Sequence, residues 1–508
     1  MTTEFAPARA TARTWAGLGV LALALLLISV DATVLDTAIP AISADLAPST
    51  PQLLWIIDIY SFVLAGLLIT MGTLGDRIGR RRLLLAGAAG FGLASALAAW
   101  AVNPEMLIAA RVLQGVAGAT LMPATLGLIR GMFADPRERT LAISVWGAMA
   151  GSGAAVGPLL GGWLLEHFWW GSVFLVNLPV MGLLIVLGPL LIPESKDPDP
   201  GRFDLVSAGL SMLALIPIVY AVKEIAAHGL AWGPLAAAAI GALAGARFLR
   251  RQARLADPLL DLALFGRPAF RAAALTNLLS VFALAGVLFF GSQYLQLVLD
   301  RTPLQAGLLL VPGTVGSIVG ALVAAWLVRW WRPGQVLCGS MLMAAVGASL
   351  FWLLRAEPAA EVWPFVVGFG LIGVGAGVAL TVSADLIVSS APAERAGNAA
   401  AISETALEGG VALGVAVLGS VVMAEYRSGL DSVSADHVGA ARESLGGAVE
   451  LARALPESTA TALLESARTA FVSGIHLAAA ATTAILLLTT VLVHRATRDQ
   501  GERTSATP

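Results

Sequence analysis

Fourteen long apolar stretches, separated by charged residues, proline or glycine, follow one another along almost the whole chain. Each contains about 20 residues or more, the length that a helix needs to cross the hydrocarbon core of a bilayer. The pattern predicts spanning helices at residues 15–37, 52–74, 82–101, 105–130, 139–165, 171–193, 205–223, 230–249, 269–298, 303–328, 333–354, 361–388, 399–424 and 472–493. We therefore expect an all-α integral membrane protein with fourteen transmembrane helices.

The composition excludes the soluble classes of protein. Of the 508 residues, 57% are hydrophobic and 13% are charged, whereas soluble domains have about 45–50% and about 25%. A nucleic-acid-binding protein is therefore excluded, and the partner is a lipid bilayer. The two lysines, Lys196 and Lys223, do not stand in a Gly-Lys-Ser/Thr sequence, so the chain offers no P-loop for a nucleotide. We expect no nucleotide and no cofactor, so that any transport is driven by a gradient or by a partner protein.

Arginine and lysine are distributed unequally between the predicted loops. Alternate loops hold clusters such as Arg80, Arg81 and Arg82, whereas the short loops between them hold isolated basic residues. Because basic residues accumulate on the cytoplasmic side, we predict a multi-pass protein with both termini in the cytoplasm. An acidic extracellular loop at about 425–470 is expected to form short amphipathic helices, either as a solvated cap or as a gate that collects substrate.

A weak internal repeat indicates two bundles. The sequence after the second predicted span, GTLGDRIGRRRLLLAG, resembles the sequence ALVAAWLVRWWRPGQVLCG near the tenth, and Arg77 and Arg329 are 329 − 77 = 252 residues apart. Secondary transporters are often built from such repeats, with the substrate between them. We predict a six-helix bundle over 1–200, two additional helices with linkers over 201–262, and a second six-helix bundle over 263–508.

Ionisable side chains inside the predicted spans are few, and each costs at least about 2.5–3.5 kcal/mol on insertion scales. They are Asp31, Asp36, Asp58, Arg111, Asp385, Glu404 and Glu408. At about 1.5 Å per residue, Asp31, Asp58 and Arg111 share a layer about 24–28 Å from the cytoplasmic end. Glu404 and Glu408 lie closer to the cytoplasmic end, in the inner half of their span and on one face of its helix. Asp36 and Asp385 lie near the interfaces, where a structural role is expected.

These acids suit exchange of a proton for a cation. A buried carboxyl group can hold either one, so competition between them couples the two fluxes. We predict that Asp31, Asp58, Glu404 and Glu408 bind protons and substrate, and that Arg111 neutralises one of the outer aspartates. The alternative for Arg111 is a buried ion pair that only orients its helices.

Other residue types bear on substrate and reaction class. Aromatic rings stack on delocalised cations, and the candidates for such a pocket are Trp55, Tyr60, Trp146 and Tyr294. The five histidines form no His-Glu-x-x-His pair, and no Gly-x-Ser-x-Gly sequence is present. The chain therefore offers neither a metal site nor a catalytic nucleophile, and we do not expect an enzyme.

Several sequence motifs resemble those of the major facilitator superfamily. GTLGDRIGRRR is similar to the signature loop between its second and third helices, RVLQGVAGA beginning at Arg111 resembles its helix-4 motif, and a Gly-Pro-x-x-Gly-Gly sequence resembles the helix-5 motif of its antiporters. The residues that match the loop and the helix-5 motif are Gly72, Asp76, Arg77, Gly79, Arg80, Gly157, Pro158 and Gly161. The resemblance implies that Asp76 holds the bundles together as a conformational latch, and that Gly157 and Pro158 keep a helix contact tight against leak.

The sequence around Asp31, Asp58 and Glu404 is similar to that of the fourteen-helix drug:proton antiporters that export quaternary ammonium compounds and dyes. The resemblance implies a proton-coupled multidrug efflux pump of the bacterial inner membrane for lipophilic cations such as ethidium, and we expect a monomer. Ser403 and Ser317 stand where some of these pumps carry acids, which favours monovalent substrates. The alternative is an exporter of an endogenous metabolite, lipid or antibiotic.

Overall fold

The computed structural model describes most of the chain: residues 9–48, 50–196, 204–228, 231–255, 258, 260–391, 396–430, 441–442 and 445–504. Within the helices, the side chains of Asp36, Asp58 and Pro158 also lie outside the described part. The described residues are helical almost throughout and include no strand. The predicted all-α class is confirmed.

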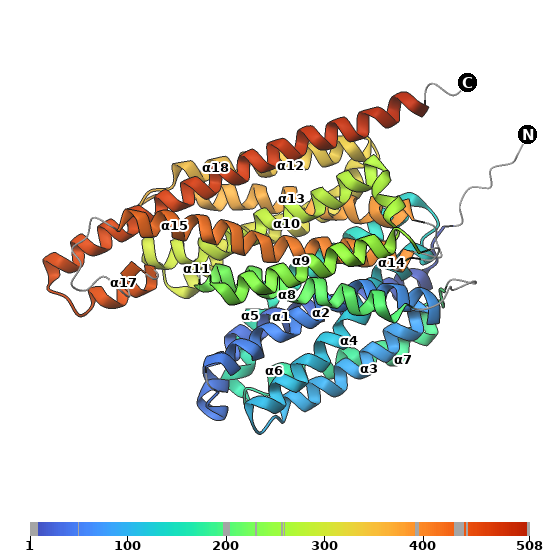
Figure 1. Ribbon diagram of the computed structural model, residues 1–508, viewed down its shortest axis with the longest axis horizontal. Helices are drawn as coiled ribbons and strands as arrows, with labels where there is room; N and C mark the ends of the chain where they lie inside the picture. Colours follow the sequence, from blue (N-terminus) through green and yellow to red (C-terminus); the bar gives the residue numbers. More distant parts are fainter. Residues whose placement is uncertain are drawn as a thin grey trace, which may run out of the picture.

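Helices α1 to α7 pack against one another and form the N-terminal bundle (Figure 1). They are α1 (Ala12–Leu46), α2 (Thr50–Ile78), α3 (Arg80–Ala99), α4 (Pro104–Met132), α5 (Pro136–His167), α6 (Ser172–Leu175) and α7 (Asn177–Leu191). The starts of two of these helices follow from the sequence. Asn103 and Asp135 cap α4 and α5, and a proline begins each of the two, which is a favoured start signal.

The C-terminal bundle is formed by the helices from α10 onward. They are α10 (Pro268–Gln293), α11 (Pro303–Leu327), α12 (Pro333–Ser349), α13 (Trp363–Ser390), α14 (Ala396–Leu413), α15 (Gly419–Gly429), α17 (Leu445–Ala452) and α18 (Glu457–Thr504). Shorter turns join or extend them: η1 (Leu262–Gly266), η2 (Tyr294–Val298), η3 (Leu350–Leu353) and η5 (Gly414–Leu418).

Twelve helical segments of the described chain are long and apolar enough to cross a membrane. They correspond to twelve of the fourteen predicted spans. The two remaining predictions, 139–165 and 399–424, are also helical, in α5 and in the continuous run α14, η5 and α15. Both α5 and α14 contact the opposite bundle, so these two helices lie where the bundles meet.

Helices α8 (Leu205–His228) and α9 (Trp232–Gln252) pair with each other between the two bundles, as the green ribbons of Figure 1 show. Helix α8 packs on α2, where the hydroxyls of Thr70 and Ser211 lie 3.3 Å apart, and it also contacts α14 and α15. An ion pair of 2.8 Å between Arg251 and Asp204 joins the far end of α9 to the start of α8. The domain boundaries at about 200 and 262 stay predictions.

The region after α15 differs from the expectation of short, solvated helices. Residues 457–471 belong to α18, which runs without a break into the last predicted span. Tyr426, Leu445 and Phe471 are buried in one apolar cluster with the C-terminal bundle, and the Tyr426 hydroxyl donates to the Ala441 carbonyl at 2.7 Å. The expectation of a short, separate helix over residues 457–471 is therefore wrong, because this segment continues into the last span and its apolar face packs into the bundle core. Residues 431–440 and 443–444 lie outside the described part.

Candidate functional site

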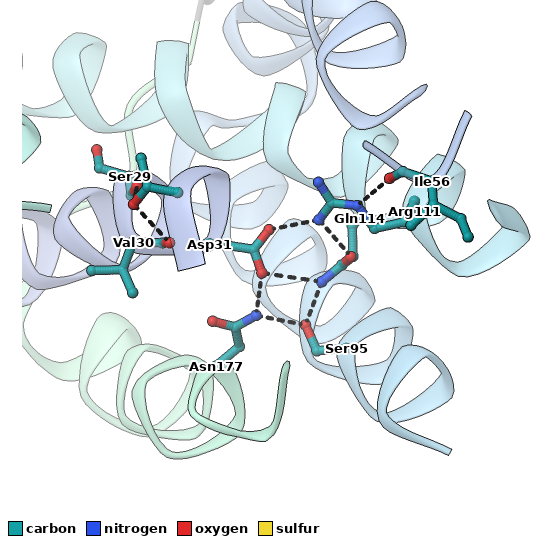
Figure 2. Close-up of polar contacts among 9 residues, drawn as sticks. Ser29, Val30, Asp31, Ile56, Ser95, Arg111, Gln114 and Asn177 are labelled. Carbon is teal, nitrogen blue, oxygen red and sulfur yellow. Dashed lines mark hydrogen bonds and ion pairs between the residues drawn. The ribbon is translucent and has the colours of Figure 1, made fainter. Parts of the chain in front are cut away.

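Asp31 lies at the centre of a buried polar network inside the N-terminal bundle (Figure 2). Its carboxylate is 1% exposed and forms an ion pair with Arg111, with 3.0 Å between Oδ2 and Nη1. Its second oxygen accepts hydrogen bonds from Asn177 Nδ2 at 2.7 Å and from Gln114 Nε2 at 3.4 Å. Both oxygens of this acid are therefore occupied.

The amides of Asn177 and Gln114 are themselves fixed by Ser95, whose hydroxyl lies 3.0 Å and 2.9 Å from their nitrogens. The network joins α1, α3, α4 and α7 across the core of the bundle (Figure 2). Sequence reasoning considered ionisable groups alone and missed these three residues. Their signal was present: Gln114 lies one helical turn after Arg111, and Asn177 is an amide within an apolar span.

Arg111 has three kinds of partner. Besides Asp31, its Nη1 donates to Gln114 Oε1 at 3.1 Å and its Nε to the Ile56 carbonyl at 3.3 Å. Its guanidinium also lies over the ring of Tyr60, 4.5 Å from the centroid, a cation–π distance. Arg111 therefore ties α1, α2 and α4 together, which is the arrangement expected of a buried, orienting ion pair.

Glu404, on α14, is in a different state from Asp31. Its side chain is 1% exposed, and its Oε2 is buried without a hydrogen-bond partner among the described residues. Glu408 follows one turn later, half-buried and within electrostatic reach of both Glu404 and Tyr60. Helix α14 packs on α2 and α4, and the electrostatic interaction of Glu408 with Tyr60 of α2 indicates that the face of α14 with these two acids is turned toward that contact.

Next to Glu404, the side chain of Asn277 on α10 holds α14 in place. Asn277 Nδ2 donates to the Ser403 carbonyl at 2.9 Å and lies 3.1 Å from the Ser403 hydroxyl. The Asn277 carbonyl oxygen is buried and has no hydrogen-bond partner in the described part. The region around Glu404 therefore carries spare hydrogen-bond acceptors, which suits a proton or a cation.

The four aromatic candidates do not gather in one pocket. Tyr60 is covered by Arg111, and Trp146 is buried in the N-terminal bundle with its Nε1 donating to Thr125. Tyr294 is buried in the C-terminal bundle, where its hydroxyl donates to the Arg355 carbonyl. Trp55 is 43% exposed. Of the four, Tyr60 lies beside the ionisable residues.

The signature loop connects α2 to α3 through Gly79, whose φ of 111° is a conformation that glycine adopts easily. Asp76 pairs with Arg80 at 2.7 Å, and Arg80 Nη1 lies 2.7 Å from the Ser195 hydroxyl. These described contacts of Asp76 and Arg80 lie within the N-terminal bundle. Gly72 is buried in α2, and Arg77 is half-buried at its end.

A contact between the two bundles was missed by the sequence analysis. Arg139 Nε on α5 lies 2.7 Å from Asp385 Oδ1 on α13, and the Thr140 hydroxyl donates to Asp385 Oδ2 at 3.0 Å. Arg139 is at the start of α5 and Asp385 near the end of α13, at the end of the molecule where α1 begins (Figure 1). We call Arg139, Thr140 and Asp385 the inter-bundle clasp.

Helix α5 also packs closely on α1, as the small residues predicted. A Cβ atom at Gly157 would lie 1.9 Å from Thr33 Oγ1, and one at Gly161 would lie 2.2 Å from Thr37 Oγ1. Both hydroxyls donate to α1 carbonyls, at 3.2 Å for Thr33 and 2.7 Å for Thr37. Glycine at these positions therefore allows contact between helix backbones.

Comparison with known proteins identifies the family. Residues 21–415 match the model of the Major Facilitator Superfamily. The chain belongs to the Major Facilitator Superfamily. It is therefore a multi-pass membrane transporter and not an enzyme. A solved structure of this superfamily fold, that of the human organic anion transporter MFSD10, is similar with a TM-score of 0.62 at 14% identity and covers 94% of this chain and 99% of that one.

Curated members of the superfamily are similar over nearly the whole chain. The multidrug efflux pump LfrA of Mycolicibacterium smegmatis is 49% identical over 92% of this chain and 93% of its own length. The methyl viologen resistance protein SmvA of Salmonella typhimurium is 35% identical over 94% and 97%. The tetracenomycin C resistance and export protein of Streptomyces glaucescens is 34% identical over 94% and 90%.

Proposed function

We propose that this transporter exports lipophilic monovalent cations across the bacterial inner membrane in exchange for protons, by alternating access, with both termini in the cytoplasm. The observation that carries the proposal is the buried carboxyl group of Glu404, whose Oε2 has no hydrogen-bond partner among the described residues. An uncompensated buried carboxylate is costly. Either a proton or an organic cation removes that cost, so each displaces the other.

Glu408 extends this site along the same face of α14. Two carboxyl groups one turn apart attract a cation more strongly than one does, and repulsion between them favours keeping a proton when the cation leaves. The packing of α14 on the helices α2 and α4 supports an exchange site at the contact between the two bundles. A site at that contact becomes accessible from opposite sides in turn.

Asp31 has a different role in the conformation described. Arg111, Asn177 and Gln114 satisfy its carboxylate, so a cationic substrate would have to displace Arg111 to reach it. We assign the first proton and cation exchange to Glu404 and Glu408, and assign to Asp31 and Arg111 the coupling of that exchange to the N-terminal bundle. The side chain of Asp58 lies outside the described part, and its role as a further acid stays a prediction.

The named relatives support export of drugs and toxic cations. LfrA is a multidrug efflux pump and SmvA a methyl viologen resistance protein, and each matches this chain over more than nine-tenths of both lengths. Because methyl viologen is a dication, SmvA supports a cationic substrate and does not bear on the restriction to monovalent ones. The tetracenomycin C resistance and export protein favours a second candidate, in which the substrate is an antibiotic. That candidate does not explain two acids at the contact between the bundles.

The test is efflux from everted membrane vesicles with an imposed pH gradient. Ethidium, methyl viologen and tetracenomycin C are compared in the parent, Glu404→Gln and the control Glu465→Gln, an exposed position on α18. We expect gradient-driven ethidium transport that Glu404→Gln abolishes and the control retains. Equal ethidium transport by parent and Glu404→Gln would remove this site from the mechanism. Transport of tetracenomycin C without either cation would establish the second candidate.

A further inference from the structure

A cavity of about 310 Å³ lies at one end of the N-terminal bundle, apart from the acids discussed above. It is open to the surface and is lined by the first turns of α1 and α3, by the last turns of α4 and α7 and by the residues that follow α7, which meet at the same end of the bundle. Arg13, Thr14 and Arg81 supply polar groups, whereas Met132, Leu191 and Pro193 supply an apolar wall. The cavity therefore offers positive charge next to an apolar surface.

The two guanidiniums are fixed at the cavity wall. Arg13 Nε donates to the Leu190 carbonyl at 2.9 Å, and Arg81 Nη1 donates to the Ile192 carbonyl at 3.0 Å. Both therefore bind to the carboxyl end of α7, the negative pole of its helix dipole. Arg13 Nη2 also donates to the Leu190 carbonyl. A guanidinium carries five N–H donors, so these bonds use only a part of each set and leave N–H groups that can bind an oxyanion.

The charge of this corner is positive. Glu194 Oε2 lies 3.8 Å from Arg81 Nε and 3.9 Å from Arg82 Nε, while Glu194 Oε1 accepts from the backbone N–H of Arg81 at 3.0 Å. Among these described contacts, Glu194 stands against Arg81 and Arg82, and Arg13, which also lines the cavity, adds a third positive charge. A planar guanidinium binds a phosphate through paired hydrogen bonds.

An apolar stripe on α7 leads away from the cavity. Leu183, Val186 and Leu190 are 40%, 64% and 59% exposed, and they recur at helical spacing on the side of α7 that no other described helix covers. The helix ends around the cavity mark the depth of lipid headgroups, because they are the ends of membrane-spanning segments. The stripe therefore lies where acyl chains run.

We propose that this cavity binds the phosphate of an anionic phospholipid, with Arg13 and Arg81 on the headgroup and an acyl chain along α7. Basic pockets at the ends of transmembrane helices are suited to such headgroups. Free phosphate shares the charge, but the apolar wall and stripe give it no additional contact. The proposal concerns binding alone and stands independently of the transported substrate.

The experiment uses the full-length protein purified in a neutral detergent. Phosphatidylglycerol and phosphatidylcholine with identical acyl chains are titrated separately and bound lipid is counted by native mass spectrometry, while inorganic phosphate is titrated by calorimetry. The variants are Arg13→Gln, the double variant Arg13→Gln/Arg81→Gln and the control Arg250→Gln, an exposed arginine in the last turn of α9. Thermal unfolding of each variant verifies its fold.

We expect the parent to bind phosphatidylglycerol about tenfold more tightly than phosphatidylcholine, because each lost charge-assisted contact weakens binding by a factor of this order. Arg13→Gln should reduce that preference, the double variant should abolish it, and Arg250→Gln should keep it. An unchanged preference in folded Arg13→Gln and in the double variant would overturn the proposal. Inorganic phosphate that binds as tightly as the lipid would also overturn it, in favour of a soluble anion. If the double variant does not fold, the comparison between the parent and Arg13→Gln alone tests the proposal, because Arg13 is exposed.

Discussion

Replacing Asp31 by asparagine separates a structural role of this acid from a purely chemical one. The substitution keeps the shape of the side chain and removes its charge, so Arg111 loses its ion-pair partner in the bundle core. The new amide has one acceptor oxygen, whereas the carboxylate accepts from Arg111 on one oxygen and from Asn177 on the other. One of these donors must therefore lose its hydrogen bond or face another N–H.

The expected loss of stability is large. Removing one partner of a buried ion pair costs about 3–5 kcal/mol, because the remaining charge is uncompensated. For a folding unit of about 200 residues, each kcal/mol lowers the melting temperature by about 2–4 °C. We therefore expect Asp31→Asn to lower the melting temperature of the purified protein by about 6 °C or more. Glu404→Gln should lower it much less, since one oxygen of Glu404 has no hydrogen-bond partner in the described part to lose.

The assay is thermal unfolding in detergent, followed by the fluorescence of intrinsic tryptophan. The control is Asp300→Asn, which breaks an Asp–Arg pair of 2.6 Å in which the aspartate is 57% exposed, and such exposed pairs contribute less than about 1 kcal/mol. The double variant Asp31→Asn/Arg111→Gln should recover part of the loss, because no buried charge is left unpaired. A melting temperature of Asp31→Asn equal to that of the parent would refute the reasoning and mean that Arg111 is satisfied without this carboxylate.

Three further outcomes are expected. Asp385→Asn breaks the inter-bundle clasp and should increase the labelling of cysteines introduced at that end of the interface. The swapped pair Arg139→Asp/Asp385→Arg should restore the labelling of the parent. Labelling that Asp385→Asn leaves unchanged would show that the clasp does not hold the two bundles together. Gly157→Val forces α1 and α5 apart, so it should lower the free energy of unfolding by about 1–3 kcal/mol and let protons leak across the membrane of vesicles. Gly162→Val should have neither effect, because its added Cβ has no neighbouring atom within 4 Å. Equal proton leak in both variants would contradict the packing argument. The hydrogen bond from the guanidinium of Arg251 on α9 holds the pKa of Asp204 well below its usual value. The contribution of Asp204 to stability should therefore be constant from neutral pH down to about pH 5 and decline below about pH 4. It is measured as the difference in stability between the parent and Asp204→Asn against pH, and a difference that grows on acidification would contradict this reasoning.

The spans were predictable because bilayer thickness fixes the length of apolar helix, which is a local property of the sequence. Close packing of α5 was predictable for a similar reason, since Gly157 and Gly161 recur at the spacing of one helix face, whereas its partner α1 was not. The continuity of α18 could not be predicted, because its first turns have an amphipathic sequence. The partner of their apolar face is evident only in the folded structure, where Phe471 packs into the bundle.

The site was predictable in its residues and much less in its connections. The charges of Asp31, Arg111 and Glu404 are conspicuous in apolar spans because burying them is costly. Their partners are far away in sequence: Asn177 lies 146 residues from Asp31, and Asp385 lies 246 residues from Arg139. Neutral amides and residues near helix ends cost little in a membrane, so only the folded arrangement of the helices distinguishes them from incidental polar residues.

The uninterrupted helix α18 extends the C-terminal bundle with a long rod that follows any rotation of the bundle. Its 48 residues give a rod about 72 Å long at about 1.5 Å per residue, more than twice the hydrocarbon thickness of about 30 Å. A rotation of the bundle by about 10° would therefore displace one tip of the rod relative to the other by roughly 12 Å. A spectroscopic probe or a rigid fusion partner attached at the α17 end would thus magnify a small rocking motion into a displacement that is readily resolved.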